Sequence, residues 1–107
     1  MKFKIIWSSF AEEQIDEIFE YYKTEASPKI AKNLTSNLIK SAEILSDNPY
    51  VGQVEELLIE RAGKYRYLVY RNYKIIYSID AENQFIKIAD VFDTRQNPIK
   101  IERNTLR

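Results

Sequence analysis

Hydrophobic positions change their period about halfway along the chain. In the first half, apolar residues recur at helical spacing with acidic residues between them: Ala11, Ile15, Ile18, Phe19 and Tyr22. Ser9 followed by Glu12 fits a capping box, in which the hydroxyl accepts a hydrogen bond from a free backbone N–H at the helix start. This pattern predicts a first helix that ends near Glu25.

A second helix is predicted to begin at Ser27 and Pro28. Serine suits the cap, and proline suits the first helical position because the N–H that it lacks would have no partner there. One apolar stripe follows: Ala31, Leu34, Leu38, Ala42 and Leu45. Asn48-Pro49 is expected to end this helix, with Gly52 in the turn after it. The very short linker predicts that the two helices form an antiparallel hairpin.

Strand-forming residues occupy the start and the second half of the chain. The segment Phe3–Trp7 is β-branched and aromatic and predicts a first strand. Later segments rich in Tyr, Val, Leu and Ile predict further strands, the first of them short: residues 57–59, 65–70, 73–79 and 85–92. Arg71-Asn72 predicts a tight turn, since Asn tolerates a positive φ, and residues 80–83 predict another turn. The tail from Asp93 is expected to be irregular or to form a short added element.

This order of elements predicts the fold class. We expect a single domain over residues 1–107, of α+β class, with two layers in the order β-α-α-β(3-4). Tight turns make the later strands an antiparallel meander, so the sheet should be mainly antiparallel. The helical hairpin must bury its apolar stripes against one face of that sheet.

Composition excludes several kinds of chemistry. The 107 residues include no cysteine and no histidine, so disulfides, thiolate metal sites and the commonest general base are absent. No Walker loop or dinucleotide fingerprint occurs, and we expect no metal and no small-molecule cofactor. No apolar run approaches the roughly 20 residues of a membrane span, and Met1–Trp7 is short for a signal peptide. We therefore expect a cytoplasmic protein that does not bind membranes.

Charge is balanced overall but unevenly distributed. The chain has 16 basic and 16 acidic residues. Residues 12–25 hold six acids against one lysine, which favours a solvated helix face, whereas residues 61–74 hold five bases and no acid. Cations on rigid strands, interleaved with tyrosines, suit a single-stranded nucleic acid or another phosphate-rich partner. The alternative is that the tyrosines belong to the core and the cations solvate the outer face.

The second half also resembles a known family. Tyr65-Arg66-Tyr67-Leu68-Val69, a short turn and Tyr73-Lys74-Ile75-Ile76-Tyr77 are similar to the central hairpin of RelE/ParE-type toxins, and Val91–Pro98 is similar to their last strand. Phe19-Glu20-Tyr21-Tyr22 and Asn48-Pro49 fit the helical half. The resemblance implies that this protein is the toxin of a type II toxin–antitoxin module. Such a toxin inhibits bacterial growth and is neutralised by a cognate antitoxin, and some of these modules act in plasmid stabilisation.

The resemblance implies two alternative targets, which the fold does not decide between. A RelE-like toxin would cleave messenger RNA on the ribosome, and its catalytic cations would be Arg66, Lys74 and Arg95. A ParE-like toxin would inhibit DNA gyrase without catalytic residues of its own. The residues expected to contact nucleic acid or target are Arg61, Lys64, Arg71 and Tyr70.

Departures from the RNA-cleaving pattern favour the ParE-like interpretation. RNA-cleaving members carry a tyrosine or histidine near the C-terminus, but this chain has no histidine and no tyrosine after Tyr77. A further basic position of the family is Leu68 here. A third interpretation is a non-toxic, degenerate member or an RNA-binding module on the same fold.

The length of the hairpin loop decides whether two of the candidate cations can act together. If the loop is only Arg71-Asn72, Val69 opposes Lys74, and Arg66 points to the opposite face from Lys74. If the loop has three residues, Tyr70 opposes Lys74, and the two cations share a face. A joint phosphate site needs the second register or a bulge, and the sequence is compatible with either.

Overall fold

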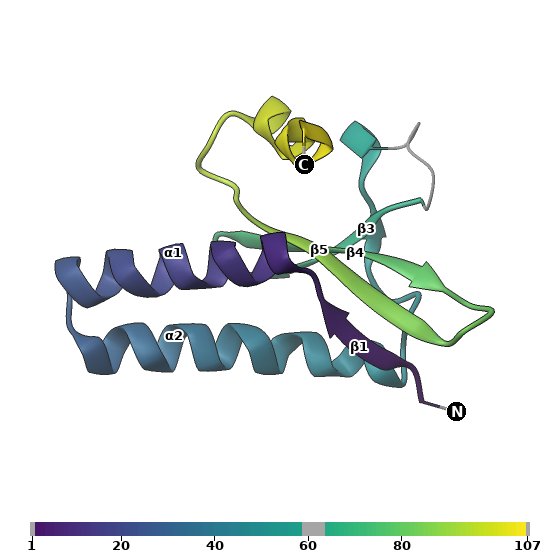
Figure 1. Ribbon diagram of the computed structural model, residues 1–107, viewed down its shortest axis with the longest axis horizontal. Helices are drawn as coiled ribbons and strands as arrows, with labels where there is room; N and C mark the ends of the chain where they lie inside the picture. The colour runs from purple at the N-terminus through teal and green to yellow at the C-terminus, as the bar shows by residue number, and fades with distance from the viewer. Residues whose placement is uncertain (1, 59–63, 107) are drawn as a thin grey trace.

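The computed structural model describes residues 2–58 and 64–106, with the backbone alone for residues 103–106. Its helices and strands are β1 (Lys4–Trp7), α1 (Ser9–Glu25), α2 (Pro28–Ser41), β2 (Gln53–Val54), β3 (Arg66–Tyr70), β4 (Tyr73–Asp80) and β5 (Phe85–Asp93). Three 3₁₀ helices complete the fold: η1 (Ala42–Ser46), η2 (Glu56–Leu58) and η3 (Pro98–Leu106). Figure 1 shows α1 and α2 side by side as the predicted antiparallel hairpin.

The first helix begins one residue earlier than the predicted capping box implies. Ser8, rather than Ser9, is the cap, and its hydroxyl accepts a hydrogen bond from the Ala11 N–H at 3.0 Å. The Ser8 N–H is bonded to the Ile88 carbonyl, so the chain passes directly from the β1–β5 ladder into the helix. The capping box at Ser9 is therefore wrong, whereas the predicted end at Glu25 is confirmed.

The start of the second helix is confirmed, but its end differs from the prediction. The Ser27 hydroxyl accepts a hydrogen bond from the Ile30 N–H at 3.1 Å, and Pro28 is the first helical residue. Regular α-helix stops at Ser41, and the tighter η1 continues the chain to Ser46. There the Ser46 hydroxyl donates to the Phe3 carbonyl at 2.9 Å, which fixes the end of the helical hairpin to the first strand.

The sheet has the strand order β1-β5-β4-β3-β2. β1 pairs in parallel with β5, and every other pair is antiparallel, so the expected mainly antiparallel sheet is confirmed. The short strand expected at 57–59 is wrong: Gln53–Val54 forms it instead, Leu57 and Leu58 lie in η2, and residue 59 lies outside the described residues. Among the described residues, the hydrogen bond from the Glu55 N–H to the Tyr65 carbonyl is the last backbone contact along the β2–β3 pair before the chain turns into η2.

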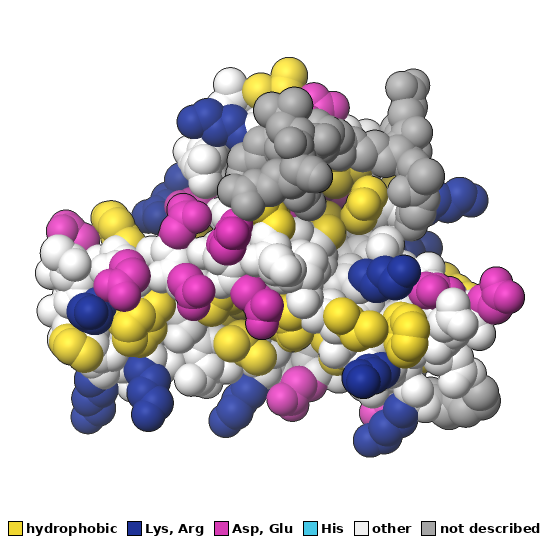
Figure 2. All heavy atoms as spheres, viewed as in Figure 1, with side chains coloured by type: hydrophobic (Ala, Val, Ile, Leu, Met, Phe, Trp, Pro, Cys, Tyr) yellow, Lys and Arg dark blue, Asp and Glu magenta, His cyan; other side chains and the backbone are white. Residues whose placement is uncertain are grey.

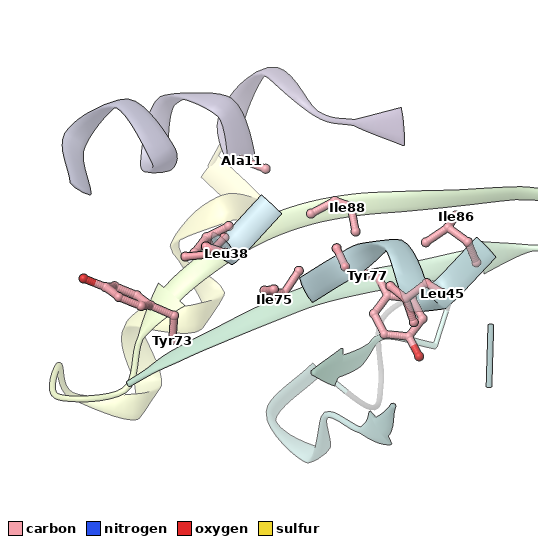
Figure 3. Close-up of a cluster of buried hydrophobic side chains, with 10 residues drawn as sticks. Ala11, Leu38, Leu45, Tyr73, Ile75, Tyr77, Ile86 and Ile88 are labelled. Atoms are coloured by element: carbon pink, nitrogen blue, oxygen red, sulfur yellow. The ribbon is translucent and has the colours of Figure 1, made fainter. Parts of the chain in front are cut away.

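The main core lies between the helical hairpin and one face of the sheet. Figure 3 shows its side chains converging from α1, α2, η1, β4 and β5: Ala11, Leu38, Leu45, Tyr73, Ile75, Tyr77, Ile86 and Ile88. We call this the helix face of the sheet. Burial of these side chains fixes the register, because a slip of one residue would turn the apolar set of a strand outward.

The opposite face, here called the far face, has a smaller core of its own. Leu58 of η2 and Ile101 of η3 pack there against Ile76 and Phe92. Two of the tyrosines that could have served as stacking surfaces, Tyr65 and Tyr67, pack partly buried against the same cluster. The far face is thus partly covered.

The turn between β3 and β4 has two residues, which is the shorter of the two loop lengths that the sequence left open. Arg71, not Asn72, takes the positive φ, at 54°. Asn72 instead bonds to the end of β5: its side-chain amide donates to the Asp93 carboxylate at 3.1 Å, and its carbonyl accepts from the Thr94 N–H at 2.8 Å. Among the described residues, no helix has the length and apolarity to cross a membrane.

Candidate functional site

The β3–β4 register places two of the candidate cations on opposite faces of the sheet. Tyr70 pairs with Tyr73, and Val69 pairs with Lys74, as the two-residue loop requires. Arg66 pairs with Tyr77 and shares the helix face with it, while Lys74 projects from the far face. The bulge in the sheet lies between β4 and β5 and does not change this relationship.

Arg66 holds the loop between η1 and β2. Its Nη1 donates to the Gly52 carbonyl at 2.8 Å and to the Tyr50 carbonyl at 3.3 Å, and the guanidinium carbon lies 5.3 Å from the centre of the Tyr50 ring. Tyr77 supports the same loop, because its hydroxyl donates to the Pro49 carbonyl and accepts from the Gly52 N–H. Burial raises the pKa of the Tyr77 phenol, which stays neutral.

Lys74 is tied to a carboxylate on the far face. Its Nζ lies 2.8 Å from Glu55 Oε1, and the Glu55 side chain is only 4% exposed. The ammonium also lies 4.2 Å from the centre of the Tyr67 ring. A lysine held this way by a carboxylate and an aromatic face links β4 to the segment after β2.

Arg95 is tied to Asp93, two residues before it. Its Nη2 lies 2.7 Å from Asp93 Oδ2, and its Nε donates to both oxygens of the same carboxylate. The Arg95 hydrogen bonds hold the pKa of Asp93 below its ordinary value, and Asp93 in turn raises the pKa of Arg95. The hollow beside Arg95, about 460 Å³ between α1 and the end of β5, is also lined by Glu17. Two carboxylates in one wall do not favour phosphate.

These positions change the expected site. The predicted catalytic cations Arg66, Lys74 and Arg95 do not converge, and two of them are neutralised by carboxylates. Tyr73 and Tyr77 are buried in the main core, so they cannot stack on bases. The rigid cationic platform expected from the sequence is therefore not formed by these residues.

The tip of the β3–β4 hairpin retains an exposed cation. Arg71 has no carboxylate partner in the described part of the chain, and its guanidinium lies over the Tyr70 ring, with Nε donating to the Tyr70 hydroxyl at 3.4 Å. That hydrogen bond is the first cause of a raised pKa at Arg71. Lys64 is exposed at a φ of 45°, and Arg61 lies outside the described residues.

A groove joins the hairpin tip to the second helix. It has a volume of about 260 Å³, and we call it the hairpin-tip groove; it is lined by Tyr22, Ile30, Asn33, Leu34, Asn37, Arg71 and Asn72. Asn33 and Asn37 are one turn apart on α2, so their amides share a side of the helix. Amides that both donate and accept, beside one cation and an exposed isoleucine, suit a polypeptide surface.

Sequence reasoning found Tyr70 and Arg71 but missed the α2 side of this groove. The i, i+4 spacing of Asn33 and Asn37 was a usable signal, because it places two amides next to each other on a polar helix face. The described residues contain no cluster of His, Cys, Asp and Glu that could hold a metal ion.

Comparisons with known proteins agree with this fold. A solved structure described as the chromosomal ParDE TA system from P. aeruginosa superposes with a TM-score of 0.71 at 16% identity, covering 86% of this chain and 96% of that chain. The toxin–antitoxin complex RelBE2 from Mycobacterium tuberculosis gives 0.59 at 19% identity, covering 87% and 99%. No curated protein matches the sequence.

A family model matches nearly the whole chain. The model of the ParE toxin of the type II toxin–antitoxin system parDE matches residues 5–98, from within β1 to the start of η3. Because this match covers most of the chain, the protein belongs to the ParE toxin family and is the toxin of a type II toxin–antitoxin system.

Proposed function

We propose that this toxin inhibits growth by binding a protein target, DNA gyrase, and that it does not cleave RNA. The observation that carries this proposal is the separation of Arg66 and Lys74 by the sheet. The hairpin-tip groove, which is lined by Arg71, supplies the contact with the target, together with the Tyr70 ring under the Arg71 guanidinium.

The chemistry of RNA cleavage explains why this separation matters. Attack of a 2′-hydroxyl on the adjacent phosphate needs a base, cations for the developing charge and an acid for the leaving oxygen, all around one phosphate. Cations that point to opposite faces cannot surround one group. Lys74 and Arg95 would also have to leave Glu55 and Asp93 before either could bind phosphate.

A cognate antitoxin is the second partner in this proposal. Both similar structures are described as toxin–antitoxin assemblies, one ParDE and one RelBE2. Arg71 and Lys64 are exposed cations that acidic residues of an antitoxin could cover. High salt should then weaken the complex, because contacts between exposed charges are screened. An affinity that does not change with ionic strength would argue for apolar contacts instead.

Two purified assays test the choice of target. The toxin should block DNA supercoiling by gyrase in a dose-dependent manner, and it should leave messages on translating ribosomes intact. Cleavage of ribosome-bound message, with supercoiling unaffected, would overturn the proposal in favour of a RelE-like endonuclease. Arg71→Ala should weaken inhibition of gyrase, whereas Lys100→Ala, an exposed cation of η3, provides the matched control.

Growth of bacteria tests whether the chain is active at all. Expression of the chain alone should arrest growth, and co-expression with its cognate antitoxin should restore growth. Normal growth with folded protein present would indicate a degenerate, non-toxic member.

A further inference from the structure

The outer side of the helical hairpin has an apolar floor. Trp7, Ile15 and Ile39 line a hollow of about 260 Å³ on this side, together with Glu12 and Asp16. Ile39 is an apolar side chain that is 40% exposed in the middle of a charged surface. Figure 2 shows hydrophobic side chains running between the two helices on this face of the molecule. We call this surface the outer helix face.

Charges of opposite sign flank that floor. Acidic side chains follow α1: Glu12, Glu13, Asp16, Glu17 and Glu20. Exposed lysines follow α2: Lys29, Lys32 and Lys40. Figure 2 shows the acidic row over α1 and basic side chains along the other edge. Two residues break this separation of charge. Lys23 is a base on α1, where it pairs with Glu20 at 3.4 Å, and Glu43 is an acid just beyond the end of α2.

The acidic row and the lysine row lie on different helices. Among the described residues, no ion pair links α1 to α2. The one ion pair that involves either helix there, Lys23 with Glu20, lies within α1. The antiparallel hairpin places Ile15 beside Ile39 and Tyr22 beside Ile30, as the grooves on its two sides indicate. At this offset Glu12 is level with Lys40.

We propose that the outer helix face binds the same face of a second copy of this chain. A twofold axis parallel to the helices would place α1 of one copy over α2 of the other, so each acidic row would meet a lysine row. The same axis brings Glu12 of one copy to Lys40 of the other, and Glu20 to Lys32. A twofold axis across the helices would instead place acids over acids.

The size of the surface fixes the expected strength. α2 and η1 together span about 31 Å, at 1.5 Å per residue for α2 and about 2.0 Å for η1, and two helices are about 20 Å wide, so each copy would bury about 600 Å². The total of about 1,200 Å² is at the low end for specific interfaces. The dimer should therefore be weak, dependent on concentration and weakened by salt. It does not rest on the proposed target, because the hairpin-tip groove lies on the other side of α2.

Charge reversal provides the decisive experiment. Sedimentation equilibrium of the wild-type chain should show a monomer–dimer equilibrium. The variants Lys32→Glu/Lys40→Glu and Glu12→Lys/Glu20→Lys should each be monomeric, because each places like charges together at both contacts, residue 12 with residue 40 and residue 20 with residue 32. Mixed in equal amounts, they should form a heterodimer of at least wild-type affinity. Lys64→Glu is the control and should leave the dimer unchanged, because Lys64 lies outside both helices, just before β3.

Each outcome decides the proposal. A wild-type chain that stays monomeric at millimolar concentration would overturn it, and so would a mixture of the two variants that stays monomeric. Ile39→Gln provides an independent check that leaves both charged rows intact, and it should also abolish the dimer. Circular dichroism of each variant confirms that the helices are retained, so loss of association cannot be attributed to unfolding.

Discussion

Lys74 and Glu55 form an ion pair of 2.8 Å on the sheet face opposite the helical hairpin. Glu55 also accepts a hydrogen bond from the Leu57 N–H at 3.4 Å, so the carboxylate joins β4 to the start of η2. The pair explains the presence of a lysine in a strand of the sheet without any reference to catalysis. The pair therefore assigns Lys74 a structural role rather than a catalytic one.

The first prediction concerns the stability that this pair provides. Lys74→Met should lower the free energy of unfolding by about 3 kcal/mol, because it leaves the nearly buried Glu55 charge without a partner. Glu55→Gln/Lys74→Met should recover most of that loss, because no uncompensated charge remains. Urea denaturation measures both values.

The same variants separate the two roles of Lys74. If the lysine is structural, the double variant should still arrest growth as the wild type does. A double variant that is as stable as the wild type but no longer toxic would contradict this assignment and would support a direct role for the ammonium.

The second prediction concerns the loop that carries Gly52. A methyl group at residue 52 would lie 2.7 Å from the Tyr67 carbonyl oxygen and would also press on the Tyr77 ring. Because the Tyr67 carbonyl is backbone and cannot rotate away, Gly52→Ala should lower the free energy of unfolding by about 2 kcal/mol.

Tyr77→Phe tests the other half of the same contact. It removes the hydrogen bonds with the Gly52 N–H and the Pro49 carbonyl, both 3.0 Å or shorter, and should cost about 2 kcal/mol. Tyr67→Phe is the matched control, because among the described residues its hydroxyl bonds only to the exposed Gln53 side chain, and it should cost much less. Equal losses in the two variants would show that the Tyr77 hydroxyl has no special role.

Local patterns in the sequence were sufficient for most elements of this fold. Ser27-Pro28 marks a helix start through groups adjacent in the chain, and the structure confirms it. Ser8 and Ser9 are both chemically suitable caps for the first helix. The choice between them is made by the Ile88 carbonyl, 80 residues away from Ser8. A contact of that kind leaves no trace in the local sequence.

The candidate site depended still more on distant contacts. The sequence identified Arg66, Lys74 and Arg95 as cations on or beside strands, which is correct as far as position is concerned. Their partners come from elsewhere: Glu55 follows β2, and the carbonyls that bind Arg66 belong to residues 50 and 52. Whether a cation is available to a ligand depends on such partners.

The third prediction concerns Arg71 at the hairpin tip. Arg71→Ala should leave the thermal midpoint within about one degree of the wild type, because the side chain is exposed. Binding to the proposed target, DNA gyrase, should weaken about tenfold, since exposed arginines stacked on aromatic rings are frequent anchors of interfaces. Surface plasmon resonance with immobilised gyrase measures the affinity.

Asn33→Ala, alone and combined with Arg71→Ala, makes that result specific to the groove. Asn33→Ala should weaken binding less than Arg71→Ala, and the two losses should not be additive because both residues line the same groove. Wild-type affinity in both variants would place the target contact elsewhere on the molecule, and additive losses would show that the two residues contribute to binding independently rather than through one groove.

The last prediction concerns alkaline pH. Tyr73 is buried, and burial, followed by a hydrogen bond with Tyr22, raises the pKa of its phenol to about 12 from an ordinary value near 10. The folded protein therefore retains a proton that the unfolded chain releases. This contribution to stability is complete below pH 10 and is lost as the pH rises towards 12, by about 2 kcal/mol at pH 12.

Urea unfolding between pH 8 and 11.5 tests this dependence. Tyr73→Phe should flatten the decline, leaving a smaller slope from Tyr77, whose pKa burial also raises. Tyr21→Phe, at an exposed tyrosine, should decline in parallel with the wild type. If Tyr73→Phe also lost stability in parallel with the wild type, the alkaline loss would have to arise from groups outside the main core, and the buried phenol would contribute nothing to it.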